Sequence, residues 1–281
     1  MIGNIEQLLK VLGTRTPEAV EAAKALAKKG VPALCLPLKR PESLSSPQGR
    51  HAIARLLFVT DISKIMSNLL DAIASKDWRP VQTAGDVLYA MGRRSAPILI
   101  KYLETEKRSE GKINAMFVLQ RISTDEAGKA IEKIALTDKD PNVRSVAVMT
   151  LGMIGAFSSK DTVVKVLRDK SLDVRFSAVK SAGYLRIKEA AKQIVKIVEK
   201  EKDPKVKAVG IYSLDRIGNP EVAKDILGFL KDSDAYVRWS AAVALRRIWN
   251  DSCRPILKKM KDPDKVVASA ILETMQICCS K

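Results

Sequence analysis

Apolar residues recur along this chain in a pattern that repeats about every 31 residues. The clearest copies are DPNVRSVAVMTLGMIG at 140–155, DVRFSAVKSAGYLRI at 173–187, DPKVKAVGIYSLDRIG at 203–218 and DAYVRWSAAVALRRI at 234–248. The valines that lead them are 31, 32 and 31 residues apart: Val143, Val174, Val206 and Val237. A fixed period of this length is typical of a solenoid, in which one supersecondary unit stacks on the next.

Each copy predicts one amphipathic helix. A small residue follows the leading position by 4 residues, and larger apolar residues usually follow it by 8 and 11, as in Ala147, Leu151 and Ile154. These spacings place the side chains on a single helical stripe. A glycine often comes next, which suits a helix end with positive φ. Asp-Pro before the stripe is a helix-start signal, with Asp as the cap.

Weaker copies extend the pattern to both ends of the chain, and we place their leading positions at Glu18, Arg50, Pro80, Gly111 and Val266. A second amphipathic segment of 9 to 12 residues lies between successive copies, for example APILIKYLE at 96–104 and AAKQIVKIVEK at 190–200. The sequence therefore predicts an all-α solenoid of about nine helix pairs.

We expect residues 1–281 to form a single repeat array, degenerate over 1–124 and regular over 125–277. The least regular segment is KRPESLSSPQG at 39–49, which holds two Pro, three Ser and a Gly. Such a composition favours an exposed loop inside the array. A domain boundary at this segment is the alternative.

The combination of an apolar–basic helix, then D-P-x-V-R, then a helix with Ala and Leu at the offsets above resembles the HEAT repeat. It is most similar to the short HEAT-like units of phycobilisome lyases. The resemblance implies a right-handed α-superhelix whose second helices line the concave side. It implies no activity, because HEAT arrays include scaffolds, transport receptors, enzyme subunits and nucleic-acid binders.

Two catalytic branches of this fold can be tested by residue. Deoxyhypusine hydroxylases hold iron with paired His-Glu motifs, whereas this chain has one histidine, His51, which is followed by Ala52. HEAT-like DNA glycosylases use Trp and Asp one helical turn apart, but Gln82, Val243 and Cys253 follow the three tryptophans by four residues. We therefore expect no enzymatic activity, no metal and no cofactor.

Composition adds a strong positive charge. The chain has 49 Lys and Arg against 32 Asp and Glu, a net charge of +17, with the larger excess after residue 140. Such a charge favours anionic partners, whereas a solvated Lys-rich surface is the alternative. The four scattered cysteines predict reduced thiols and a cytoplasmic protein. No apolar stretch approaches the ~18 residues of a membrane span.

Two sets of cations recur at fixed places. The first follows the leading position: Arg144, Arg175, Lys207 and Arg238. We interpret it as a structural ladder with the preceding Asp140, Asp173, Asp203 and Asp234, a phosphate-binding track being the alternative. The second set lies at the far end of the same helices, where no repeating Asp accompanies it: Arg93, Arg94, Arg121, Arg186, Arg216, Arg246 and Arg247. We predict that this set faces a partner, although complementation of helix C-terminal dipoles would also place cations there.

Aromatic residues on the late second helices complete the candidate surface. They are Phe176, Tyr184, Tyr212, Tyr236, Trp239 and Trp249, and Trp239 is the one we most expect at an interface. Packing between helices is the alternative for each. The leading hypothesis is a non-catalytic scaffold that binds an acidic or extended protein through its concave face. Nucleic-acid binding is the second hypothesis, and a subunit that assists an enzyme is the third.

Overall fold

The computed structural model describes residues 4–122 and 125–279, and all regular secondary structure in these ranges is helical. Its α-helices alternate as the first and second members of nine pairs. The first helices are α1 (Ile5–Leu12), α3 (Val31–Cys35), α5 (Ile62–Ile73), α7 (Ala96–Thr105), α9 (Gly128–Thr137), α11 (Lys160–Val166), α13 (Ala191–Lys200), α15 (Ala223–Phe229) and α17 (Arg254–Lys258). The second helices are α2 (Glu18–Lys28), α4 (Pro47–Phe58), α6 (Trp78–Ala90), α8 (Ser109–Ile122), α10 (Pro141–Met153), α12 (Leu172–Tyr184), α14 (Pro204–Ile217), α16 (Ala235–Ala244) and α18 (Lys265–Cys279).

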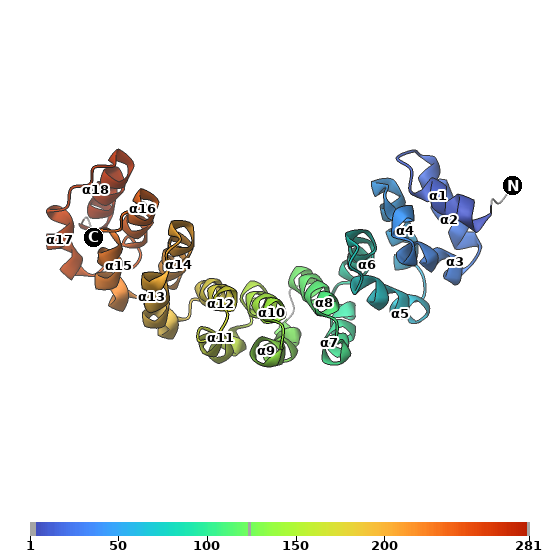
Figure 1. The fold of residues 1–281 in the computed structure, drawn as a ribbon, viewed down its shortest axis with the longest axis horizontal. Helices are drawn as coiled ribbons and strands as arrows, with labels where there is room; N and C mark the ends of the chain where they lie inside the picture. The colour runs from blue at the N-terminus through green and yellow to red at the C-terminus, as the bar shows by residue number, and fades with distance from the viewer. Residues whose placement is uncertain (1–3, 123–124, 280–281) are drawn as a thin grey trace. The chain divides into compact units, whose positions relative to one another are not determined.

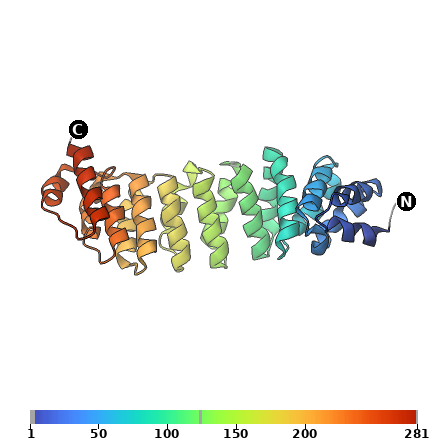
Figure 2. The same cartoon turned by 90° about the horizontal axis from the view of Figure 1, so that it is seen from above.

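The helices form two compact units, residues 1–131 and 132–281. In the first unit, α2, α4, α6 and α8 pack side by side in that order. In the second unit, α10, α12, α14, α16 and α18 do the same, and α11, α13, α15 and α17 each pack on the second helix of their own pair (Figures 1 and 2). Each of the nine predicted leading positions lies in a second helix. The all-α repeat architecture is therefore confirmed.

The core of each regular repeat is the predicted stripe. Val143, Ala147 and Leu151 are fully buried, and Ile154 is buried behind them. Burial of a Val, Leu or Ile side chain is worth roughly 1.5–3 kcal/mol. One stripe per helix pair therefore supplies the main attraction between neighbouring repeats.

Helix starts and ends follow the local signals in the sequence. Asp140 and Asp203 are the N-caps of α10 and α14, each accepting a hydrogen bond from the backbone N–H two residues later. A proline occupies the first turn in both helices. The predicted closing glycines adopt positive φ, as at Gly155 (71°) and Gly218 (64°).

The prediction of an exposed loop at 39–49 is wrong. Two 3-10 helices, Leu36–Lys39 and Pro41–Leu44, lead directly into α4. Leu44 is fully buried, and the buried Ser46 caps α4 by accepting from the N–H of Gly49. Pro41 is the first residue of the second 3-10 helix and Pro47 is the first residue of α4, so the two prolines of this segment start helices instead of breaking them.

The register of two degenerate repeats differs by one residue from the predicted one. In α18 Val267 is buried and Val266 is 65% exposed, so Val267 leads that stripe. In α4 the buried Gly49 leads, and a Cβ there would lie 2.2 Å from the carbonyl oxygen of Leu12. Only glycine permits this approach between α4 and α1. Arg50 consequently takes the cation position that follows the leading residue.

Small residues also set the distance between the regular second helices. A Cβ on Gly152 of α10 would lie 2.7 Å from the Cα of Ser181 in α12. The hydroxyl of Ser181 donates to the carbonyl of Val148 at 2.7 Å, and Thr274 of α18 donates to Ala242 of α16 in the same way at 2.8 Å. A side-chain hydrogen bond thus ties neighbouring helices at their closest approach, and in α10 and α12 a second one joins Ser145 and Ser177 at 2.8 Å.

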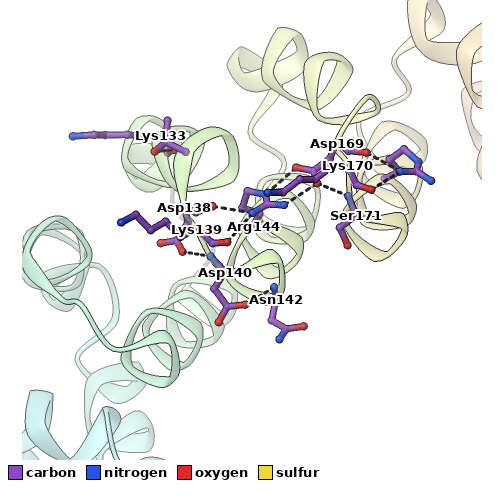
Figure 3. Close-up of polar contacts among 11 residues, drawn as sticks. Lys133, Asp138, Lys139, Asp140, Asn142, Arg144, Asp169, Lys170 and Ser171 are labelled. Carbon is purple, nitrogen blue, oxygen red and sulfur yellow. Dashed lines mark hydrogen bonds and ion pairs between the residues drawn. The ribbon is translucent and has the colours of Figure 1, made fainter.

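Arg144 joins one repeat to the next by an inter-repeat bridge. Its Nη1 donates to the carbonyls of Asp138 and Lys139 in the loop before its own helix, at 2.9 and 3.2 Å. Its Nε and Nη2 donate to both carboxylate oxygens of Asp169, in the loop of the following repeat, at 2.8 and 2.9 Å. Figure 3 shows Arg144 lying between these two loops. The hydrogen bonds from Arg144 lower the pKa of Asp169.

The same inter-repeat bridge recurs later in the chain. Arg238 donates at 2.8 and 3.1 Å to both carboxylate oxygens of Asp262, and Lys207 lies 2.6 Å from a carboxylate oxygen of Asp232. The partners therefore come from the following repeat and not from the expected Asp140, Asp203 and Asp234. Those three aspartates serve as helix N-caps, whereas Asp173 lies in the first turn of α12, whose N-cap is Ser171.

Removing the cation from an inter-repeat bridge should destabilise the second unit. In Arg144→Met the carboxylate of Asp169, whose side chain is 12% exposed, loses its partner while staying largely buried. We expect the free energy of unfolding to fall by about 3 kcal/mol, measured by urea titration followed by circular dichroism. Arg168→Met is the matched control, because Arg168 is exposed and makes no ion pair in the described ranges. Equal losses in the two variants would refute the structural role of Arg144.

The contribution of this bridge should depend on pH. The pKa of Asp169 is lowered in the folded protein, so its stabilisation is complete above the unfolded pKa of about 3.9. It is lost as the pH falls through the lowered pKa of the folded state. The difference in the free energy of unfolding between the wild type and Arg144→Met should therefore shrink as the pH is lowered from about 6 to about 3, the range in which an aspartate carboxyl becomes protonated. A difference that stays constant over this range would contradict the ion pair.

Candidate partner-binding surface

Large apolar side chains stand exposed on the second helices of residues 132–281, on the side away from the core. In α16, Tyr236, Trp239 and Val243 follow one another at spacings of 3 and 4, so they share one helical face. We call the following residues the aromatic stripe: Met153, Tyr184, Tyr212, Arg216, Tyr236, Trp239 and Leu272. All are exposed except Arg216, which is half-buried. Six of them are thus apolar or aromatic side chains whose burial would favour binding.

Arg216 of α14 stacks on two tyrosines. Its guanidinium carbon lies 5.1 Å from the ring centre of Tyr184 on α12 and 6.0 Å from that of Tyr212 on α14. Each stacking contact is worth about 0.5–1 kcal/mol at an exposed site. The Nε of Arg216 is buried and has no hydrogen-bond partner among the described residues. The tyrosines hold the guanidinium in place while leaving its charge without an ion-pair partner in those residues.

Trp239 stacks on Tyr236 at the other end of the aromatic stripe. The ring centres are 5.8 Å apart and the planes are inclined by 12°. Trp239 keeps 36% of its surface exposed, and Tyr236 keeps 55%. Two ordered aromatic rings with free faces suit the anchor of an interface, because little conformational entropy is lost when they bind.

Arg246 and Arg247, which follow α16, are held by acidic side chains. Arg246 lies 2.7 Å from Glu273 of α18, and Arg247 lies 3.6 Å from Asp215 of α14. Both arginines, together with Asp215 and Val243, line a hollow between α14 and α16. Burial raises the pKa of Asp215, and Arg247 partly counteracts this rise. The sequence analysis found no repeating Asp beside this set of arginines, and these two residues have acidic partners that follow no common offset.

Arg121 is also paired, in the unit formed by residues 1–131. It lies 3.1 Å from Asp86 of α6 and stacks on Tyr89 of the same helix at 4.1 Å. Arg93 and Arg94 lie in the 3-10 helix Gly92–Ser95 and are exposed, with no ion pair in the part of the chain that is described. The predicted set is therefore divided between the two units: Arg93, Arg94 and Arg121 lie in the first, and Arg186, Arg216, Trp239, Arg246 and Arg247 lie in the second.

The acidic partners of these arginines escaped the sequence analysis because they occupy no common offset. Asp86 lies 35 residues before Arg121, Asp215 lies 32 before Arg247, and Glu273 lies 27 after Arg246. A search at one offset finds none of them. The signal that could have revealed them is an acid one repeat away on the outer face of the neighbouring second helix.

Arg186 replaces the closing glycine of its repeat. Its φ is 51°, the only positive φ at a non-glycine residue in the described ranges, and its side chain is exposed. A side chain in this region of backbone space costs roughly 1–2 kcal/mol. Strain of this kind is concentrated at functional positions, and Arg186 follows Tyr184 of the aromatic stripe by two residues.

Comparisons with known proteins agree with this architecture. A family model of HEAT repeats matches residues 96–183, 128–199 and 191–276. No curated protein sequence is similar enough to count as a relative. No helix in the described part of the chain has the length and apolar content needed to cross a bilayer.

Two solved structures with TM-scores above 0.5 show the same fold. An engineered protein is 21% identical over 98% of this chain and 89% of its own, with a TM-score of 0.52. YibA of Escherichia coli is 15% identical over 81% of this chain and 96% of its own, with a TM-score of 0.54. The CpcE–CpcF complex of phycocyanin lyase from Nostoc is 17% identical over 82% of this chain and 89% of its own, at a TM-score of 0.41. At these identities the likeness concerns the fold alone.

Replacing Arg186 by glycine should stabilise the protein. The left-handed conformation costs a glycine little, so we expect Arg186→Gly to raise the free energy of unfolding by about 1 kcal/mol. Arg186→Ala keeps the Cβ and should leave stability close to that of the wild type. Thermal unfolding of the three proteins measures the difference. Equal stability of the glycine and alanine variants would show that Arg186 is not strained.

Proposed function

This chain belongs to the HEAT-repeat family, and we propose that it is a non-catalytic scaffold that binds a protein partner through the aromatic stripe. The observation that carries the proposal is the run of exposed aromatic rings on α12, α14 and α16. Arginine and aromatic side chains dominate the energetics of protein–protein interfaces. Stacked in advance on each other, as Arg216 and Tyr184 are, they lose little freedom on binding.

The charges around the aromatic stripe favour a protein partner over nucleic acid. A surface for the phosphate backbone needs several unpaired cations in a row. Here Glu273 and Asp215 neutralise Arg246 and Arg247, and the exposed members of the aromatic stripe are apolar or aromatic side chains. Acids and apolar rings on one face match the composition of a protein interface.

The partner that fits this surface is an extended segment with apolar side chains and some negative charge. Its apolar side chains would cover Tyr236 and Trp239, whose rings are exposed. A carboxylate of the segment would pair with Arg186 or Arg216, which make no ion pair in the described residues. The exposed second-helix face of a repeat array suits such a segment, because successive helices offer evenly spaced contacts.

Truncating Trp239 should weaken binding of the partner. We would introduce a photo-crosslinking amino acid in place of Tyr212 to identify the partner in native extract, and then titrate the purified partner. Loss of a central aromatic typically costs 2 kcal/mol or more, so we expect Trp239→Ala to lower affinity by about thirtyfold. Calorimetry measures the affinity, and circular dichroism verifies that the variant is folded.

The control is Ile256→Ala, which removes an exposed side chain from α17 and should leave affinity unchanged. Equal affinities for the wild type and Trp239→Ala would contradict the proposal. Titration with duplex and single-stranded oligonucleotides across a salt series tests the competing ligand. Tight binding that falls by orders of magnitude between roughly 50 and 200 mM salt would replace the protein partner with nucleic acid.

A further inference from the structure

In the second unit, the inter-repeat bridge at Arg175 lacks its acidic member. Arg175 stands in α12 where Arg144 and Arg238 stand in α10 and α16, and its Nη1 donates to the carbonyls of Asp169 and Lys170 at 2.7 and 3.1 Å. This half of the contact repeats that of Arg144. The other half is missing, because Arg175 makes no ion pair with any described residue.

The donors left open on Arg175 are those that hold a carboxylate elsewhere. In Arg144 and Arg238, Nε and Nη2 together grip both oxygens of an aspartate. In Arg175 the same two atoms have no acceptor among the described residues, and neither is buried. An exposed guanidinium edge fixed in this orientation is a preformed bidentate site for an oxyanion.

The cause lies at Glu201. Like Asp169, Asp232 and Asp262, it lies in the loop just before a second helix, here α14 of the following repeat. Its carboxylate accepts from the N–H groups of Lys202 and Asp203 at 2.7 and 3.0 Å. Asp169, Asp232 and Asp262 each also accept from one backbone N–H and still pair with a cation. Glu201, one of whose oxygens accepts from two N–H groups, makes no ion pair with Arg175. One added methylene thus separates this repeat from its neighbours.

The space beside Arg175 is a hollow between α12 and α13. Besides Arg175 and Glu201 it is lined by Lys196, Lys200, Lys202 and the exposed Leu172. The three lysines are exposed and make no ion pair in the described residues. The hollow therefore combines a positive potential with an apolar contact, and it is lined by residues other than those of the aromatic stripe.

We propose that this hollow binds an acidic side chain of a protein segment, whose carboxylate takes the place that aspartate fills at the other inter-repeat bridges. The ligand is a carboxylate because the two equivalent arginines of the second unit, Arg144 and Arg238, each bind an aspartate. The segment continues over Leu172, which is 47% exposed, so an apolar residue next to the acid completes the contact. The site is a second one, separate from the function proposed above.

The test uses the whole protein and a fluorescent peptide of alternating Asp and Leu, with the Asn–Leu peptide as the uncharged probe. Fluorescence anisotropy should show binding of the first peptide only. Charge-assisted hydrogen bonds are worth about 1.5–3 kcal/mol, so Arg175→Gln should lower affinity at least about tenfold. Arg168→Gln removes an exposed charge nearby and should change affinity less than about twofold.

Glu201→Asp separates binding from folding, because it keeps Arg175. The shorter side chain should close the bridge as Asp169 does, raise the unfolding midpoint and lower peptide affinity at least about tenfold. Unchanged peptide affinity in both Arg175→Gln and Glu201→Asp would overturn the proposal. Displacement of the peptide by inorganic phosphate or by a DNA duplex, more effective than displacement by unlabelled peptide, would also overturn it. Because Trp239 lies outside the hollow, Trp239→Ala should bind this peptide normally, which separates a failure here from a failure of the scaffold proposal.

Discussion

The regular repeats depend on a cation that hydrogen-bonds to carbonyls of its own loop and pairs with a carboxylate of the next repeat. The carbonyls of its own loop orient Arg144, so its remaining donors point to the next repeat. Orientation by two neutral acceptors offsets the entropy that a long side chain would otherwise lose on pairing. The pair is also largely withdrawn from water, which makes the loss of either partner costly. Distance and register between adjacent helix pairs are thereby set at the loops, while the apolar stripes fill the interior.

Much of this architecture could be predicted from the sequence because its signals are local. The spacing of Val143, Ala147 and Leu151 specifies a stripe, and Asp140 with Pro141 specifies a helix start. The spacing predicted the wrong leading residue in two repeats, Arg50 in place of Gly49 and Val266 in place of Val267. The close approach of Leu12 to Gly49 decides the register of α4, and the burial of Val267 decides that of α18.

The polar contacts could be predicted less well, because they join residues about 25 to 35 positions apart. The cations of the ladder were found by their period, but their partners were sought in the same loop when they lie in the following one. The candidate surface was likewise predicted only in part. Its aromatic residues were recognised as a group, whereas Asp215 and Glu273 were not recognised as the partners of Arg247 and Arg246. Contacts between repeats follow from the stacking distance, which a single repeat does not encode.

The inter-repeat bridge also bears on how such a chain can grow. The repeat formed by α15 and α16 carries an aspartate for the repeat before it, Asp232, and a cation for the repeat after it, Arg238. A segment of one period, duplicated in tandem, therefore brings both halves of a new bridge and satisfies them at once. Length can change by whole repeats without a compensating substitution, whereas a point change such as that at position 201 leaves a lasting mark on one junction.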